Sequence, residues 1–233
     1  FYNTDLTAVI IPESVTSIGN EAFRYSPLTE LTIDNASTSI GERAFQNTQL
    51  TQLVLPNTVT SIGNYAFYDI PLAELTLGNA ITTIGEQAFY SNEISTLVIP
   101  ESVTSIGNEA FRYNPLTELT IENAPMTIGS SAFRDTSITE LVIPDTVTSI
   151  GSYAFYDIPL AELSLGNGIT TIGSYAFYST ELTSLVIPDT VTSIGSYAFY
   201  DLPLVELTIG EGVTSIGNYA FYSNNITALA IPD

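Results

Sequence analysis

The sequence contains no cysteine, histidine, lysine or tryptophan. Without cysteine there can be no disulfides, zinc-thiolate sites or thiol chemistry. Without histidine as well, the usual catalytic triads and imidazole metal sites cannot be built. A pair of carboxylates could still perform glycosidase chemistry, but only in a cleft, which a regular stack does not provide. We therefore predict that the chain is not an enzyme and has no catalytic residues, no cofactor and no metal ligand set.

Basic side chains are almost absent, because the only four are Arg24, Arg43, Arg112 and Arg134. The chain also has 25 Asp and Glu residues, so its formal net charge is −21. Nucleic acid and anionic membrane surfaces would be repelled, so no nucleic-acid partner is expected. No apolar run is long enough to span a bilayer and no stretch resembles a signal peptide, so membrane insertion is not expected. The acidity is interpreted as a soluble, self-repelling surface rather than a dedicated cation site.

The phrase Ile-Gly-x-x-Ala-Phe recurs ten times, always 22 residues apart, with its first Phe at Phe23 and its last at Phe221. Such a period without insertions predicts a stack of equal coils in which each coil contacts mainly its neighbours. No linker interrupts the period, so residues 1–233 are expected to form a single elongated domain. Neither end carries a polar capping repeat, and we therefore expect a fragment of a longer protein.

Each repeat is predicted to have three parts. Residues 28–33 alternate apolar and polar side chains, which indicates a strand with one buried face, and equivalent strands should form a parallel sheet. Residues 56–63 have no regular period and are interpreted as an irregular arc, in which Gly63 is expected to adopt a conformation that a side chain would obstruct. The Ala and Phe of the motif are expected to point inward from a single helical turn. The predicted fold class is an α/β-type solenoid, mostly strand and irregular segments with short helical turns.

A second period of 44 residues lies over the first, which predicts that two kinds of coil alternate along the stack. In one kind the strand is followed by proline: Pro12, Pro56, Pro100, Pro144, Pro188 and Pro232. In the other kind the strand is followed by an acidic residue or glycine: Asp34, Gly78, Glu122, Gly166 and Gly210.

The pattern Leu28-x-x-Leu31-x-Ile33, followed in the next coil by Val59-Thr60-Ser61-Ile62-Gly63-x-x-Ala66-Phe67, resembles the BspA-like leucine-rich repeats. The likeness covers essentially the whole chain, although the cysteine that the family often has three residues after the Phe is replaced, for example by Thr48. The resemblance implies a right-handed leucine-rich solenoid with its parallel sheet on the concave side. It also implies a secreted or cell-surface microbial protein that serves in adhesion or protein binding, with no shared catalytic residues.

The outward strand positions supply the candidate binding surface. One column is mainly glutamate, and like charges in register on neighbouring strands are unfavourable. The next column alternates valine with threonine or serine. A solvated acidic face and the preference of β-branched residues for strands account for both columns without a ligand, whereas a partner that supplies basic groups and apolar contact accounts for them as a binding face. The candidate binding residues are Glu30, Glu74, Val98, Glu118, Glu140, Val142, Glu162, Val186 and Glu206.

Two further columns leave alternatives open. An acidic or amide residue follows every strand, which is typical of turn chemistry, with calcium as the alternative. The members are Glu13, Asn35, Asn57, Asn79, Glu101, Asn123, Asp145, Asn167, Asp189, Glu211 and Asp233. Tyrosines cluster from Tyr153 to Tyr222, where they shield the convex edge or offer aromatic rows to a carbohydrate or a protein.

The sequence therefore predicts a non-enzymatic, extracellular or cell-surface repeat domain that binds a protein, such as a host or matrix surface protein, through its concave face. The alternative from another class is a structural spacer that holds a further domain away from a surface. Carbohydrate or calcium binding is the weaker possibility.

Overall fold

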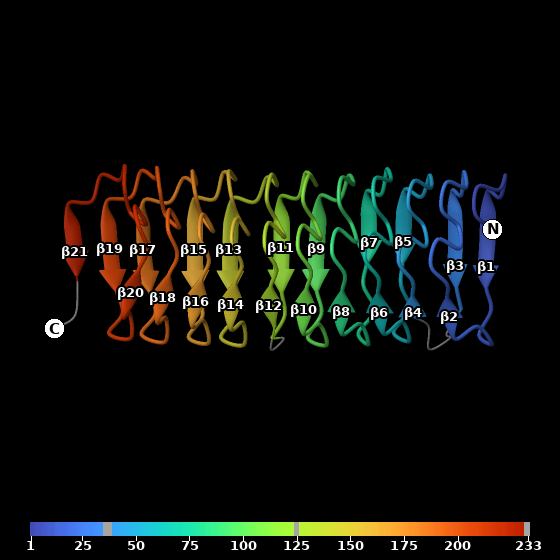
Figure 1. The fold of residues 1–233 in the computed structure, drawn as a ribbon, viewed down its shortest axis with the longest axis horizontal. Helices are drawn as coiled ribbons and strands as arrows, with labels where there is room; N and C mark the ends of the chain where they lie inside the picture. Colours follow the sequence, from blue (N-terminus) through green and yellow to red (C-terminus); the bar gives the residue numbers. More distant parts are fainter. Residues whose placement is uncertain (35–38, 124–125, 231–233) are drawn as a thin grey trace.

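The structure is a computed structural model that describes residues 1–34, 39–123 and 126–230. The chain winds into a parallel β-solenoid, and Figure 1 shows its coils following one another in sequence order in an almost straight row. The curvature that the resemblance implied is slight in this view, so the side that carries the longer strands is named the strand face below. Each coil contributes one longer strand, one two-residue strand and a run of turns.

The longer strands present a buried and an exposed side in alternation, as the sequence predicted. Their inward leucines and isoleucines fill the core, because every second side chain of a strand points to the same face. They are β1 (Ala8–Ile11), β3 (Glu30–Ile33), β5 (Gln52–Val54), β7 (Glu74–Thr76), β9 (Thr96–Ile99), β11 (Glu118–Ile121), β13 (Glu140–Ile143), β15 (Glu162–Leu165), β17 (Ser184–Ile187), β19 (Glu206–Ile209) and β21 (Ala228–Ala230).

The segment expected to be an irregular arc instead contributes a second sheet. Val59 and Ile62 are both buried although they are three apart, and a turn closed by the Val59 N–H and the Pro56 carbonyl precedes Val59. The short strands form one uninterrupted ten-stranded parallel sheet. They are β2 (Ser17–Ile18), β4 (Ser39–Ile40), β6 (Ser61–Ile62), β8 (Thr83–Ile84), β10 (Ser105–Ile106), β12 (Thr127–Ile128), β14 (Ser149–Ile150), β16 (Thr171–Ile172), β18 (Ser193–Ile194) and β20 (Ser215–Ile216).

The helical turn predicted around the motif Phe is wrong, and no helix occurs in the described residues. Each coil instead has two residues with positive φ four positions apart, such as Tyr65 at 58° and Asp69 at 55°. The N–H groups of Tyr65, Phe67 and Asp69 donate to carbonyls of the next coil at 2.8–2.9 Å. An α-helical turn would direct these donors back along their own chain, so it could not join coils. The fold is therefore a β-solenoid rather than an α/β arrangement.

The motif glycine is required for a different reason from the one predicted. No glycine in the described residues has a positive φ. Instead, neighbouring coils approach so closely that a Cβ built on Gly151 would lie 2.6 Å from the carbonyl carbon of Gly129. Contacts below about 3 Å leave no room for a side chain, so the glycine column allows the coils to pack together.

The core is centred on a column of stacked phenylalanines, as the inward-pointing motif predicted. Phe111 is fully buried, and its ring centroid lies 5.3 Å from that of Phe89 and 5.5 Å from that of Phe133. The ring planes are nearly parallel, within 6° for the first pair and 2° for the second. Burying each such ring contributes roughly 1.5–3 kcal/mol from the removal of apolar surface from water.

The longer strands pair in parallel, as predicted, but the sheet that they form along the strand face is interrupted. The hydrogen-bonded groups are β1–β3, β5–β7, β9–β11, β13–β15 and β17–β19–β21. Four breaks therefore separate β3 from β5, β7 from β9, β11 from β13, and β15 from β17.

A proline accompanies each of the four breaks. Within the β9–β11 group, the N–H of Glu122 extends the pairing by donating to the carbonyl of Ile99 at 3.0 Å. The corresponding donor across the preceding break would be the N–H of Pro100, which proline lacks. The two predicted kinds of coil are thus confirmed, and they have different effects on the sheet. The pairing of β21 with β19 is an exception, because Pro232 follows β21 in the sequence as Pro100 follows β9.

Candidate protein-binding face

The glutamates of the first column all lie at the exposed first position of a longer strand, as the alternating pattern predicted. Glu140 and Glu162 are direct cross-strand partners in the β13–β15 pair. Like charges in register repel each other, so this arrangement destabilises the free protein slightly. The residues are Glu30, Glu74, Glu118, Glu140, Glu162 and Glu206.

The valines of the second column are exposed apolar side chains on the same face. Val98 is 51% exposed, Val142 67% and Val186 64%. Val54, which was not among the predicted site residues, is 67% exposed in the equivalent position. All four lie on the strand that directly follows a break in the sheet.

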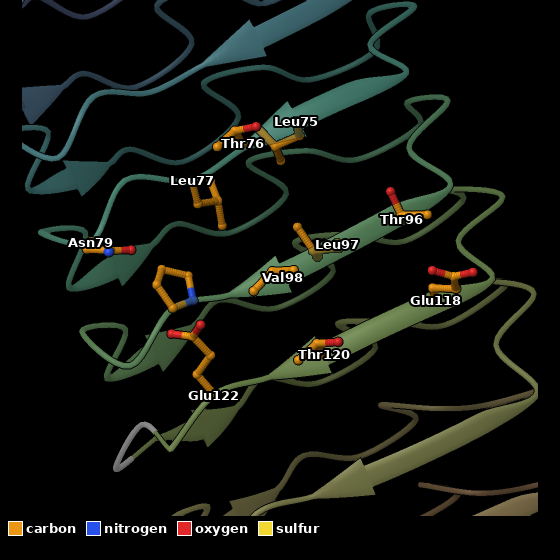
Figure 2. A pocket seen from close by; sticks show the side chains of 11 residues that line it. Leu75, Thr76, Leu77, Asn79, Thr96, Leu97, Val98, Glu118, Thr120 and Glu122 are labelled. Carbon is orange, nitrogen blue, oxygen red and sulfur yellow. The ribbon is translucent and has the colours of Figure 1, made fainter.

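Hollows open along three of the breaks, and sequence reasoning did not predict them. They measure about 440 Å³ between β3 and β5, about 260 Å³ between β7 and β9, and about 300 Å³ between β15 and β17. Figure 2 shows the hollow between β7 and β9, with Leu75, Leu97 and Val98 along the break. Glu118 lies at the start of the next strand, β11. Because Leu75 is only half-buried, the break gives access to apolar surface that pairing would have covered. The signal in the sequence was the proline period of 44 residues.

The four arginines lie among the turns and are engaged there. Arg24 pairs with Glu21 at 3.2 Å, Arg112 with Glu109 at 3.1 Å, and Arg134 with Asp135 at 3.3 Å, while Arg43 pairs with Glu42. Each guanidinium also lies over a tyrosine ring, at Tyr25, Tyr65, Tyr113 and Tyr156. For Arg112, burial acts to lower the pKa, but hydrogen bonds to Asp135 and Glu109 leave the pKa raised. The strand face therefore keeps its negative charge uncompensated.

The late tyrosines stack in two columns beside the turns. The Tyr153, Tyr175 and Tyr197 rings follow one another at centroid separations of 4.7 Å, and the Tyr156 and Tyr178 rings lie 4.8 Å apart. Because the rings stack face to face along the solenoid, their neighbours cover the faces and mainly edges and hydroxyls remain at the surface. This arrangement suits a shield over the turns better than a platform for sugar rings.

The acidic and amide side chains that follow the strands accept hydrogen bonds from backbone N–H groups of the next coil. Asp145 Oδ1 accepts the N–H of Asn167 at 2.7 Å, and Asp189 Oδ1 accepts the N–H of Glu211 at 2.9 Å. Asn35 and Asp233 of this column lie outside the described residues. Across the ranges that the structure describes, no group of three or more acidic side chains is arranged to hold a metal ion.

The described part of the chain also contains no helix that is long and apolar enough to cross a membrane.

The model of the BspA type leucine-rich repeat region matches residues 1–117, 38–161 and 104–227. No curated protein matches the chain.

Three solved structures share the fold at low sequence identity. The pneumococcal vaccine antigen PcpA is 22% identical with a TM-score of 0.57, over 95% of this chain and 69% of that one. A leucine-rich repeat protein from Bacteroides ovatus is 20% identical with a TM-score of 0.56, over 91% and 69%. Another from Eubacterium ventriosum is 24% identical with a TM-score of 0.54, over 97% and 73%. The matched repeats span almost the whole length, and the chain therefore belongs to the BspA-type leucine-rich repeat family.

Proposed function

We propose that the chain is a non-enzymatic repeat domain that binds a protein through its strand face. The observation that carries the proposal is that the strand face combines exposed valines with uncompensated glutamates, whereas the arginines elsewhere are paired with acids. Exposed apolar side chains beside charges of one sign suit a partner that is steered electrostatically and then held by desolvated contact.

We further propose that this domain acts outside the cell or on its surface, on a host or matrix protein. The family assignment supports this location, and one structural neighbour is described as a pneumococcal vaccine antigen. Carbohydrate and calcium remain the weaker ligands, since the tyrosine faces are covered and the turn carboxylates accept backbone N–H groups.

A structural spacer is the second candidate. It is favoured by the uninterrupted ten-stranded sheet and the continuous phenylalanine column, which make the stack stiff along its axis. A spacer does not require the exposed valines, and all faces of the stack would serve it equally.

The test is a triple variant, Glu118→Gln, Glu140→Gln and Glu162→Gln, measured against immobilised extracellular-matrix proteins and whole cells. We expect the melting temperature to stay equal or rise, because repulsion between neighbouring strands is relieved. Association should slow by about tenfold and depend less on salt. The matched control is Asp69→Asn, Asp157→Asn and Asp201→Asn, which removes the same charge among the turns and should leave binding nearly unchanged. If both variants bind as the parent does, the spacer function is favoured.

A further inference from the structure

The late tyrosines form one connected network of eight rings. In each of four successive coils, tyrosine occupies the same two places, which are three positions apart in the sequence. Between neighbouring coils, the ring centroids of one column lie 4.7–5.5 Å apart. The two ring centroids of one coil lie 5.5–5.7 Å apart. The first column is Tyr153, Tyr175, Tyr197 and Tyr219, and the second is Tyr156, Tyr178, Tyr200 and Tyr222.

The backbone of the turn is the same when other residues hold these places. Glu21, Arg43 and Gln87 hold the place of Tyr153 in their own coils, and their φ angles of 56°, 53° and 50° are close to its 60°. The N–H of Glu21 donates to the next coil at 2.8 Å, as that of Tyr153 does at 2.9 Å. The fold therefore does not require phenol groups at these places, and the network adds a chemical property that the turn does not need.

Tyrosine is also the only easily oxidised type of side chain that the described residues present to solvent. The sequence has no cysteine and no tryptophan, and its single methionine, Met126, is 1% exposed. Thiolates and thioethers are common targets of oxidants. Because they are absent or buried here, an oxidant in solution reacts with the tyrosines. A radical formed on one ring of the network then has other phenols as its nearest reaction partners.

We propose that this network is a site of oxidative cross-linking, at which a one-electron oxidant joins stacked tyrosines of neighbouring coils into dityrosine. Each of two phenols gives one electron to the oxidant and its hydroxyl proton to water, which leaves two phenoxyl radicals. One Cε carbon of each ring, next to the carbon that bears the oxygen, then forms the new C–C bond. Each of these carbons loses its hydrogen as a proton and each phenol oxygen regains one, so both rings become aromatic again. A peroxide activated by a peroxidase is an oxidant of this class, and it is reduced to water by the two electrons and two protons released.

The stacking determines which rings are coupled. Ring planes within a column are inclined by only 1–26°, and residues 22 apart are equivalent in the repeat, so their Cε carbons lie about as far apart as the centroids. The two rings of one coil are farther apart and inclined by 42–83°. The coupled residues should therefore be 22 positions apart rather than three. Tyr68 and Tyr90, outside the network, are stacked in the same way at 4.9 Å and should follow the same rule.

The rings also have room to react. Coupling requires two stacked rings to turn toward each other by their edges, and the rings of the network are half-buried or exposed, whereas the central phenylalanines are fully buried. The product would be a covalent link between coils, which a chain without cysteine cannot obtain from a disulfide. Like a disulfide, it would close a loop and restrict the unfolded chain. The network lies among the turns, so this inference does not depend on the protein-binding function of the strand face.

The test exposes the whole chain, in dilute solution, to photo-oxidised tris(bipyridine)ruthenium with persulfate as the electron acceptor. This reagent removes one electron at a time and needs no binding site on the protein. Dityrosine is measured by its fluorescence, and denaturing electrophoresis separates links within one molecule from links between molecules. Mass spectrometry of peptides from a protease that cleaves after acidic residues identifies the coupled tyrosines.

We expect a product of monomer size in which the coupled tyrosines are 22 positions apart. Its melting temperature should lie several degrees above that of the untreated protein, because the unfolded chain is restricted. Links mainly between tyrosines three positions apart, links mainly between molecules, or no dityrosine at all would overturn the proposal.

A pair of matched variants tests the role of the stacking. The first removes every contact between late tyrosines of neighbouring coils, yet keeps the pair within each of two coils: Tyr175→Phe, Tyr178→Phe, Tyr219→Phe and Tyr222→Phe. The control removes the same number of phenols outside the network: Tyr2→Phe, Tyr25→Phe, Tyr65→Phe and Tyr113→Phe. Phenylalanine keeps each ring, so both variants should fold, which circular dichroism checks. Dityrosine should fall several-fold in the first variant and remain near the parent level in the control. Equal yields from the two variants would mean that exposure of phenols, and not their stacking, controls the reaction.

Discussion

The side-chain carbonyl of Asn114 accepts the backbone N–H of Ile94, in the preceding coil, at 3.1 Å. The amide nitrogen of the same side chain donates to the carbonyls of Phe89 and Phe111 at 2.8 and 2.9 Å. One buried side chain thus provides partners for three backbone groups in two coils. At the equivalent position of another coil, Thr48 bonds only the carbonyl of Phe45 in its own coil.

Replacing Asn114 should show how much these bonds contribute. Asn114→Leu leaves three backbone groups without a side-chain partner, and each buried group left unpaired costs about 1–3 kcal/mol. Asn114→Thr should cost less, because a threonine hydroxyl can reach the carbonyl of Phe111 as Thr48 reaches Phe45. Urea denaturation of the two variants checks this order. Equal losses would mean that water replaces the missing bonds.

The phenylalanine column should be most sensitive in its middle. Phe111→Ala removes a fully buried ring that is stacked on both sides, and we expect a loss of about 3–5 kcal/mol. Phe221→Ala should cost less, since that ring stacks on one neighbour only among those described and is partly exposed. Chemical denaturation followed by circular dichroism compares them. A similar loss at both positions would contradict a stack in which each coil depends on its neighbours.

The close approach of the coils can be tested at two equivalent glycines. Gly151→Ala introduces a methyl group 2.6 Å from backbone atoms of the preceding coil, so the coils must separate and stability should fall by more than about 1 kcal/mol. Gly19→Ala is the control, because nothing lies within 4 Å of the added carbon in the first coil. There the reduced flexibility of the unfolded chain should stabilise by about 0.4–1 kcal/mol. Thermal melts check this prediction. If the melting temperatures of both variants shifted in the same direction, close packing of the coils would not be the reason for the glycine.

Alkaline pH should weaken the tyrosine columns. Desolvation, and after it the neighbouring phenol groups, raise the pKa of Tyr175 and Tyr178 above the ordinary value near 10. A group whose pKa is raised by folding contributes stability that is present below the unfolded pKa and is lost as pH rises through the folded one. The free energy of unfolding should therefore fall above about pH 10.

The matched variant for this test is Tyr175→Phe with Tyr178→Phe, which keeps the stacked rings and removes two titrating hydroxyls. Urea denaturation from pH 8 to 12 should show a smaller alkaline loss in the variant than in the parent. Identical curves would assign the loss to other groups.

The period, the buried phenylalanines and the outward glutamates and valines could be predicted from the sequence. In each case the residue type recurs at the same position of every coil or every second coil, together with its burial. It was not sufficient for the turn conformation. Tyr65 and Asp69 are not glycines, yet they adopt positive φ because their N–H groups then reach the next coil. Local preference suggested a helical turn, and bonding between coils outweighed it.

The hollows beside Val54, Val98 and Val186 could not be predicted from the sequence for a related reason. Pro100 and its equivalents were visible, but their effect depends on which carbonyl each proline faces in the preceding coil. That pairing is a property of the stacked register and not of one repeat. The gaps between strands therefore belong to the stacked structure, and no side-chain pattern of one repeat encodes them.

The hydrogen bonds between coils also determine how the molecule responds to tension. Those of the turns, such as the bond from Phe67 to Ala88, run along the solenoid axis, so a pull on the two ends loads the outermost coil first. Each coil that opens frees 22 residues, which extend to about 75 Å from a rise of roughly 5 Å. Under flow or shear, such a chain would lengthen in equal steps, and each step would limit the force that reaches a bound partner.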